Sequence, residues 1–461
     1  MRFNELDWTR VWKLDGAIGT MIQRHDLSED DFRKGLPLSP SRDVKGDNEC
    51  LNLSRPDVIR GIHQAYVDAG ADIIETNSFG ANSMVQGDYG LGSLAPQMAF
   101  EAARIAREVA DAAPRKVLVA GSMGPGSKSL SLPSDYFRPE WRPCSFDEMA
   151  SSYEEEAREL ILGGVDLILI ETCFDALNAK AALFGVEKAQ SGFPVIVSVS
   201  VSSGSGRCLT GQSLEAFFAA VSHAPLVAFG LNCSMGAEVL LPVVKDLARW
   251  CPVPVICYPN AGLPNASGGY DESPETMARH MAAFDGLVNI AGGCCGTTPA
   301  HIRALPVLKP RQVPEPDKSL LLSGLEAYRF ESGDMPSVSS CTNALLSEDF
   351  ARMMSEGEFD EALMLASAEV EAGAEVLDVC MDGLPDATAL MERFVRMIQC
   401  DPSVSRAALM IDSADTETLV AGLKNAQGRC LARSASHAEG EADLAEKARL
   451  IRSLGAFLLD E

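Results

Sequence analysis

The sequence lacks the features that mark membrane proteins and secreted proteins. No run of about 18 or more apolar residues occurs among the 461 residues, so we predict no transmembrane helix. The N-terminal stretch MRFNELDWTRVWKLDG has no apolar core of the signal-peptide type. Thirteen cysteines are too few for a disulfide scaffold in a chain of this size. We therefore expect a cytoplasmic protein without a membrane partner, whose cysteines are thiols, metal ligands or nucleophiles.

Basic residues are also scarce. The chain has 39 Lys and Arg against 65 Asp and Glu, which gives a net charge of −26. Nucleic acids and anionic membranes favour basic surfaces, so a nucleic-acid partner is not expected. We interpret the acidic excess as a contribution to solubility.

Eight short apolar runs, each followed by a helix-like stretch, occupy the first 300 residues or so. The runs lie at 14–20, 72–80, 116–124, 166–174, 194–201, 226–234, 254–262 and 287–295. Continuous apolar runs are typical of strands buried on both faces of a parallel sheet, and the segments between them repeat with a helical period. This pattern predicts an α/β fold, a (β/α)₈ TIM barrel. No Gly-x-Gly-x-x-Gly turn follows the first run, which argues against an open doubly wound sheet.

A second, shorter series follows the first. Residues 309–336 are rich in proline and charge and are interpreted as a linker between a first domain at 1–308 and a second at 337–461. The second domain has apolar runs at 336–342, 375–381, 407–413, 429–436 and 456–461. Five runs predict a partial second (β/α) barrel. Its last strand would have an unpaired edge, so we expect a cover such as a homo-oligomer contact.

Two adjacent cysteines, Cys294 and Cys295, stand between glycines in NIAGGCCGTTPAHI (289–302). Neighbouring Cα atoms are about 3.8 Å apart, whereas an ordinary disulfide needs about 4.4–6.8 Å, so the two are not expected to bond each other. The alternative that both are small buried hydrophobes stays open at this point.

The ends of the eight apolar runs carry the candidate chemistry. Strand ends form the active-site mouth of a TIM barrel, so the following residues should converge: Asp15, Glu75, Asn77, Glu171, Asn232, Cys233, Asn260, Cys294 and Cys295. Three thiolates in one pocket favour Zn²⁺. Three protein ligands leave one position open, as in a catalytic zinc site. Such a site carries a formal charge of −1, and a thiol bound there is deprotonated, which suits alkyl transfer to sulfur better than hydrolysis.

The same stretches resemble a known family. DGAIGT, ETNSFGAN, LILIETCFDALNAKAA, GLNCSMG, YPNAGLPN and GGCCGTTPAHI are similar to the homocysteine-binding domain of cobalamin-dependent methionine synthase and to betaine–homocysteine methyltransferase, over about residues 10–305. The resemblance implies that Cys233, Cys294 and Cys295 bind zinc and that the homocysteine thiolate takes the fourth position. It also implies a substrate site at Asp15, Gly16, Glu171 and Asn232, with Asp15 and Glu171 near the amino group. Without the resemblance, Asp15 could equally be a helix N-cap and Glu171 a member of an ion pair at the barrel rim.

The second series resembles the start of a pterin-binding domain, through GEFDEALMLASAEVEAGAEVLDVCMD and ALMIDSADTETLVAGLKNAQGR. Asn343, Asp378 and Asp412 match its site, but Cys380 and Arg433 stand where the family has amide side chains. We therefore expect a degenerate pterin site that does not bind folate.

No corrinoid motif is visible, because none of the six histidines lies in an Asp-x-His-x-x-Gly context. The resemblance thus implies a homocysteine S-methyltransferase that receives methylcobalamin in trans, from a corrinoid protein or a separate module. Two alternatives stay open. One is direct methylation from S-methylmethionine or a betaine-type donor, and the other is a non-catalytic zinc-thiolate protein that docks on a corrinoid partner.

Overall fold

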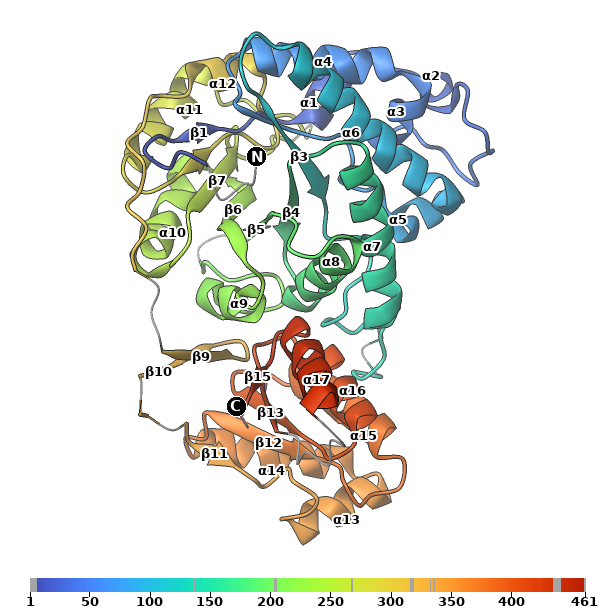
Figure 1. Ribbon diagram of the computed structural model, residues 1–461, viewed down its shortest axis with the longest axis vertical. Coiled ribbons are helices and arrows are strands. Elements are labelled where there is room, and N and C mark those ends of the chain that lie inside the picture. The colour runs from blue at the N-terminus through green and yellow to red at the C-terminus, as the bar shows by residue number, and fades with distance from the viewer. Residues whose placement is uncertain are drawn as a thin grey trace.

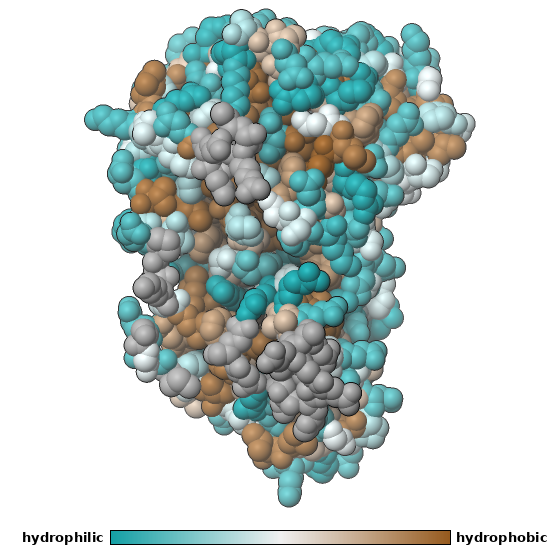
Figure 2. All heavy atoms as spheres, in the orientation of Figure 1, coloured by the Kyte–Doolittle hydropathy of each residue, from teal (hydrophilic) through white to brown (hydrophobic). Residues whose placement is uncertain are grey.

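The computed structural model describes residues 6–135, 137–202, 205–266, 268–315, 319–331, 333–334, 336–433 and 441–459. Figure 1 shows the first sheet and its helices above a second, smaller sheet with its own helices. None of the described helices is long and apolar enough to cross a membrane. Hydrophilic side chains cover much of the face shown in Figure 2, with hydrophobic patches between them.

The first sheet is a parallel barrel, as the sequence predicted. Its strands are β1 (Trp12–Lys13), β2 (Ile73–Glu75), β3 (Leu118–Met123), β4 (Leu167–Cys173), β5 (Val195–Val199), β6 (Leu226–Gly236), β7 (Val255–Asn260) and β8 (Ile290–Ala291). They pair in the order β1-β8-β7-β6-β5-β4-β3-β2. A parallel bridge between Leu14 and Ile73 joins the two ends of this order, so the barrel closes.

Helices surround the barrel (Figure 1). They are α1 (Ile18–Gln23), α2 (Glu29–Arg33), α3 (Leu51–Ser54), α4 (Pro56–Asp68), α5 (Ser83–Gly87), α6 (Ala95–Ala112), α7 (Phe146–Leu162), α8 (Ala176–Ala189), α9 (Leu214–Val221), α10 (Ala237–Trp250), α11 (Pro274–Met281) and α12 (Pro299–Ala304), with short 3₁₀ turns at Asn48–Cys50, Gly92–Leu94 and Ala282–Phe284. Side chains alternate along each strand. Leu118, Leu167 and Leu169 therefore fill the barrel interior, while Val119 and Ile168 belong to the larger cluster under the helices.

The first strand differs from its prediction. Residues 14–20 were expected to be a strand, but the strand precedes them and α1 begins at Ile18. The chain turns at Asp15 and Gly16, where a Cβ on Gly16 would lie 2.6 Å from Thr297 Oγ1. The small residues of this run therefore make a tight turn at the barrel mouth instead of extending the strand.

The second sheet has five parallel strands and forms a partial barrel, as expected. They are β11 (Val338–Ser339), β12 (Val376–Cys380), β13 (Ala408–Asp412), β14 (Leu431–Arg433) and β15 (Phe457–Leu458), paired in chain order. Its helices are α13 (Glu348–Glu356), α14 (Phe359–Glu371), α15 (Ala387–Cys400), α16 (Thr416–Asn425) and α17 (Glu441–Ser453). The ends of two predicted runs, 434–436 and 460–461, lie outside the described residues.

Residues 309–336 contain a β-hairpin. Its strands β9 (Leu320–Ser323) and β10 (Ala327–Phe330) pair antiparallel. Leu322 and Phe330 pack against Val376, Met410 and Leu431 of the second sheet. The hairpin therefore covers the face of the partial barrel that helices do not cover.

The hairpin tip also joins the two sheets. Ser323 Oγ donates to the carbonyl of Ala216 in α9 at 3.0 Å, and the Ser323 amide donates to the carbonyl of Arg429 at 3.1 Å. Leu325 connects the loop before α9 to the segment before β13, because its carbonyl accepts from the Ser213 amide at 2.9 Å and its amide donates to Ser405 at 2.8 Å. This short hairpin therefore contacts both the barrel and the second sheet.

Candidate active site

Three cysteines meet at the mouth of the barrel. Cys233 lies near the end of β6, and Cys294 and Cys295 follow β8. Their sulfur atoms all lie within 4.8 Å of one another, and the Sγ atoms of Cys233 and Cys295 are 3.9 Å apart. Among the described residues, this is the one group of three or more His, Cys, Asp or Glu side chains arranged to hold a metal ion. Each of the three side chains is only partly buried.

The backbone is unusual at Cys233 and directly after Cys295. Cys233 has φ of 59°, in the left-handed region, and the pairing of β6 with β7 shifts register between Asn232 and Gly236. Such an irregularity re-aims a side chain at a strand end. On the other side, Gly296 has φ of 82°, and a Cβ there would lie 2.3 Å from the Cβ of Tyr270. Glycine is required at this point so that the chain can turn directly after the two cysteines.

The three sulfur atoms of the cluster shift one another's pKa values through their mutual hydrogen bonds. Hydrogen bonds from Cys294 and Cys295 lower the pKa of Cys233 to about 3, and the same contact with Cys233 raises the pKa of Cys294 and Cys295. Asn260, at the end of β7, contacts Cys233, and its Oδ1 is buried without a hydrogen-bond partner. Three sulfurs form a donor set that fits a borderline-soft, tetrahedral ion and leaves one position open.

Three buried carboxyl groups belong to the same mouth. Asp15 follows β1, Glu75 ends β2 and Glu171 lies in β4. Asp15 is fully buried, and its Oδ2 accepts the backbone amide of Glu75 at 3.1 Å. Burial, and then the neighbouring carboxylates, raise the pKa of Asp15 and Glu75 well above the ordinary range. Burial also raises the pKa of Glu171 to about 7.

Glu171 is held by neutral donors. Ser122 Oγ donates to its Oε1 at 2.5 Å, and Tyr258 Oη donates to its Oε2 at 3.1 Å. The alternatives considered for the two expected substrate residues are not observed. The N-cap of α1 is Ala17 rather than Asp15, and no ion pair to Glu171 occurs within the part of the chain that the structure describes.

The side-chain amide of Asn232 forms hydrogen bonds with other protein groups. Its Oδ1 accepts from Ser198 Oγ at 2.7 Å and from the Thr172 amide at 2.9 Å. Its Nδ2 donates to Thr172 Oγ1 at 2.7 Å and lies 3.9 Å from Cys294 Sγ. Thr172 has φ of 56°, which is rare for a β-branched residue. Asn232 therefore fixes the strained turn after Glu171 beside the sulfur cluster.

The expected pterin-site residues also come together, at the strand ends of the partial barrel. Asn343 Nδ2 donates to Asp378 Oδ2 at 2.9 Å. The Arg433 guanidinium forms ion pairs with Asp378 at 3.1 Å and with Asp412 at 2.5 Å. Cys380 is buried on the same face of the sheet, at the end of β12. Arg433 thus neutralises the carboxylates at the position where the family has an amide.

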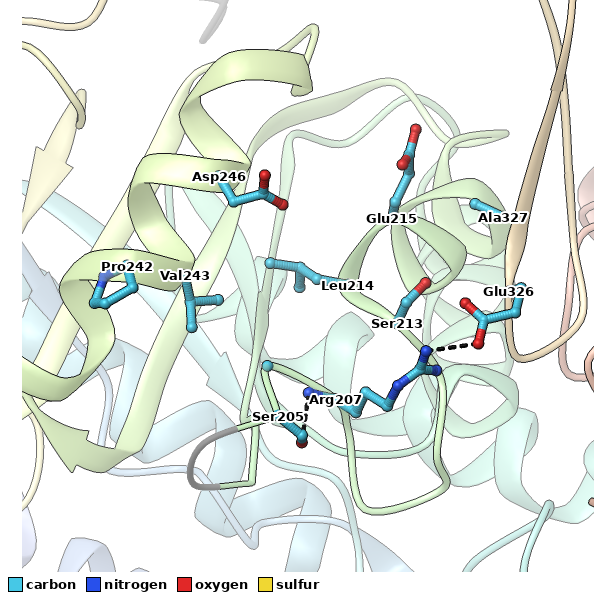
Figure 3. Close-up of a pocket in the computed structure, with 11 residues that line it drawn as sticks. Ser205, Arg207, Ser213, Leu214, Glu215, Pro242, Val243, Asp246, Glu326 and Ala327 are labelled. Atoms are coloured by element: carbon cyan, nitrogen blue, oxygen red, sulfur yellow. Dashed lines mark hydrogen bonds and ion pairs between the residues drawn. The ribbon is translucent and has the colours of Figure 1, made fainter.

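A separate hollow lies between α9, α10 and the hairpin (Figure 3). It has a volume of about 450 Å³ and is lined by Arg207, Glu215, Asp246 and Glu326 among others. Arg207 pairs with Glu326 at 2.5 Å across its lower edge. With neither cysteine nor histidine in its lining, this hollow does not share the chemistry of the barrel mouth.

A closed parallel barrel with cysteines and buried carboxyl groups gathered at the C-terminal ends of its strands defines the class of TIM-barrel enzymes. The family model for homocysteine S-methyltransferase matches residues 13–307, so this chain belongs to that family and is a methyltransferase. The model for pterin binding enzymes matches residues 341–458. Together they give the domain order of cobalamin-dependent methionine synthase, as the resemblance implied.

Solved structures agree with the fold. The oxidised form of the homocysteine methyltransferase MmuM from Escherichia coli is 23% identical, with 64% of this chain and 94% of that chain covered and a TM-score of 0.51. Its metallated form is also 23% identical, with 66% and 96% covered and a TM-score of 0.50.

Sequence reasoning did not foresee several groups at this site. Ser122 and Tyr258 hold Glu171 from β3 and β7, and Thr172 carries the strained backbone. Ser122 and Tyr258 sit inside apolar runs, where nothing in the pattern distinguishes them from core residues. Only their alternation toward the barrel interior, on strands next to those with acidic ends, could have indicated them.

Proposed function

We propose that the barrel, residues 1–308, is a zinc-dependent homocysteine S-methyltransferase that forms methionine. The observation that carries this proposal is the convergence of Cys233, Cys294 and Cys295 to within 4.8 Å, in a chain of the homocysteine S-methyltransferase family. These three cysteines would hold the ion, with Asn260 beside them. Bound Zn²⁺ keeps a thiol in its open position deprotonated and nucleophilic.

The residues of the chain orient the substrate. Asp15 and Glu171 provide negative charge for the amino group of homocysteine, and Gly16 allows the tight turn that places Asp15, because a Cβ there would meet Thr297 Oγ1 at 2.6 Å. Asn232 holds the Glu171–Thr172 turn in place. The sulfur of homocysteine is thereby presented to a methyl donor approaching the barrel mouth.

For the methyl donor we propose methylcobalamin, carried by a separate module or a corrinoid partner. The test is methionine formation from homocysteine with free methylcobalamin, with and without a chelator. Methionine formation that a chelator abolishes supports the proposal. Parallel assays with S-methylmethionine and with betaine show whether the enzyme instead uses a donor that needs no corrinoid. Zinc bound without any methionine formation would instead favour a docking protein.

We further propose that residues 337–461 are a pterin-type domain that has lost folate binding, with 309–336 joining the two domains. Arg433 and Cys380 replace groups that could pair with the polar edge of a pterin. Strand β15 pairs with β14 along one edge, and we propose that its other edge is covered by the first barrel, by a continuation of the chain or by contact with a second copy. Sedimentation at several concentrations tests this contact, and a monomer at every concentration would contradict it.

A further inference from the structure

The three buried carboxyl groups at the barrel mouth have no protein cation. Asp15 and Glu171 are 0% and 5% exposed and Glu75 is 9% exposed. No ion pair joins any of them to a described Lys, Arg or His side chain. Buried carboxylates without a partner are strongly unfavourable. Such a cluster therefore points to a cationic ligand or to bound protons.

The hydrogen bonds show which oxygen atoms are free. Both oxygens of Glu171 accept hydrogen bonds from neutral side chains. Oδ2 of Asp15 accepts the backbone amide of Glu75. Asp15 Oδ1 and Glu75 Oε1 are buried and have no partner. Glu75 and Asp15, whose carboxyl groups interact electrostatically, thus each offer one free acceptor.

We propose that Glu75 is a third carboxylate for the ammonium group of the substrate and that it sets the enzyme's specificity for α-amino thiols. This inference rests on the proposed function. A primary ammonium has three N–H donors, and the mouth offers one carboxylate for each from Asp15, Glu75 and Glu171. Each carboxylate comes from a different strand, so the cage is fixed by the barrel itself.

The position of Glu75 supports this role over a purely structural one. It ends β2, and its backbone amide already holds Asp15, so its side chain is not needed for that contact. The pKa of its carboxyl is raised by burial and by the charges of Glu171 and Asp15, with no cation to oppose them. An ammonium group would relieve this repulsion. A thiol without an amino group would leave it in place.

The experiment compares the binding of two thiols to zinc-loaded protein by calorimetry, which needs no methyl donor. The ligands are L-homocysteine and 4-mercaptobutyrate, which differ only in the amino group. The wild type should prefer homocysteine, and Glu75→Gln should reduce that preference about 10-fold or more, because a charge-assisted hydrogen bond is lost. Binding of 4-mercaptobutyrate should not change.

Glu156→Gln is the matched control, because Glu156 is also a buried carboxyl group without partners, but it lies in α7 beside Asn82. It should keep the wild-type preference. If Glu75→Gln does not fold, Glu75→Asp retracts the carboxylate by one methylene and should show the same loss of preference. Equal weakening of both ligands in a folded variant would overturn the role of Glu75, as would equal affinity of the wild type for both. If the wild type binds neither thiol, the proposed function itself fails.

Discussion

The ammonium group of Lys180, on the barrel helix α8, lies 2.9 Å from the carbonyl oxygen of Ala426, which follows α16 in the second domain. Lys180 is 1% exposed and also donates to the carbonyl of Gly428 at 3.2 Å. Burial lowers the pKa of Lys180 to about 8. A buried charged side chain therefore joins the two domains. The free-energy cost of burying its charge depends on pH.

Lys180 should make stability rise with pH. Its pKa in the folded protein is below the ordinary value of 10.5, so between about pH 8 and 10.5 the unfolded chain binds more protons, and the free energy of unfolding increases with pH. In Lys180→Met this contribution disappears. We expect the wild type to gain about 1–3 kcal/mol relative to Lys180→Met between pH 8 and pH 10. Urea titrations at these pH values measure it. The exposed Lys188→Met on the same helix is the control and should follow the wild type.

Removing any one cysteine of the cluster should remove most of the metal. We expect the purified protein to bind about one Zn²⁺, and Cys233→Ala, Cys294→Ala and Cys295→Ala each to lose most of it, since two sulfurs make a weak site. Elemental analysis after dialysis is the measurement. Cys251→Ala, a buried thiol outside the cluster, should keep the metal. Full zinc content in Cys294→Ala and Cys295→Ala would contradict the assignment of these cysteines as zinc ligands.

Glu171→Gln should weaken homocysteine binding about 10-fold or more while zinc stays bound, because the change removes a charge and leaves the sulfurs intact. Homocysteine should also release a proton near neutral pH, since the metal-bound sulfur is a thiolate. Calorimetry in buffers of different ionisation enthalpy measures this proton. Unchanged heats across the buffers would contradict it.

Asn232→Ala should destabilise the turn after Glu171. Thr172 loses two hydrogen bonds while keeping a backbone conformation that costs about 1–3 kcal/mol, so we expect a loss of about 2 kcal/mol in the free energy of unfolding. Adding Thr172→Gly should restore stability, because glycine adopts positive φ freely, but it should not restore homocysteine affinity. Denaturant titration of the wild type and of the two variants tests this. If the double variant is no more stable than Asn232→Ala, backbone strain is not the cause.

The second domain should not bind methyltetrahydrofolate in the micromolar range. Each buried polar group left unpaired on the pterin costs about 1–3 kcal/mol, so two losses weaken binding about 100-fold or more. The double variant Cys380→Asn, Arg433→Asn should recover binding, because it returns two amides and frees Asp378 and Asp412 from Arg433. Equilibrium titration measures both proteins. Micromolar affinity of the wild type for methyltetrahydrofolate would show that Cys380 and Arg433 do not prevent binding.

Much of the fold could be predicted because burial leaves a direct pattern in the sequence. The apolar runs at 166–174, 194–201 and 375–381 contain β4, β5 and β12. The run at 14–20 failed because small residues serve a tight turn as well as a buried strand, and only the contact of Gly16 with Thr297 decides between them. The hairpin in 309–336 was missed because its pairing partners are set by tertiary contacts with two sheets.

The site was predictable to the level of which strand ends converge. A cysteine at the end of the sixth run and two at the end of the eighth lie near each other because β6 and β8 both pair with β7. What the sequence could not provide is the assignment of individual hydrogen bonds. The side-chain amide of Asn232, for example, forms hydrogen bonds with Ser198 and Thr172. This pairing depends on side-chain geometry across three strands.

The hairpin of β9 and β10 determines where the chain can be cut. Ending a shortened protein at Leu308 would remove Ser323 and Leu325 from α9 and from the loop before it, and would expose the apolar surface of the barrel under Leu321. Ending it after Phe330 keeps those contacts but leaves Leu322 and Phe330 without their cover from Val376 and Met410. A soluble isolated barrel therefore needs polar replacements at Leu322 and Phe330 as well as the extra residues.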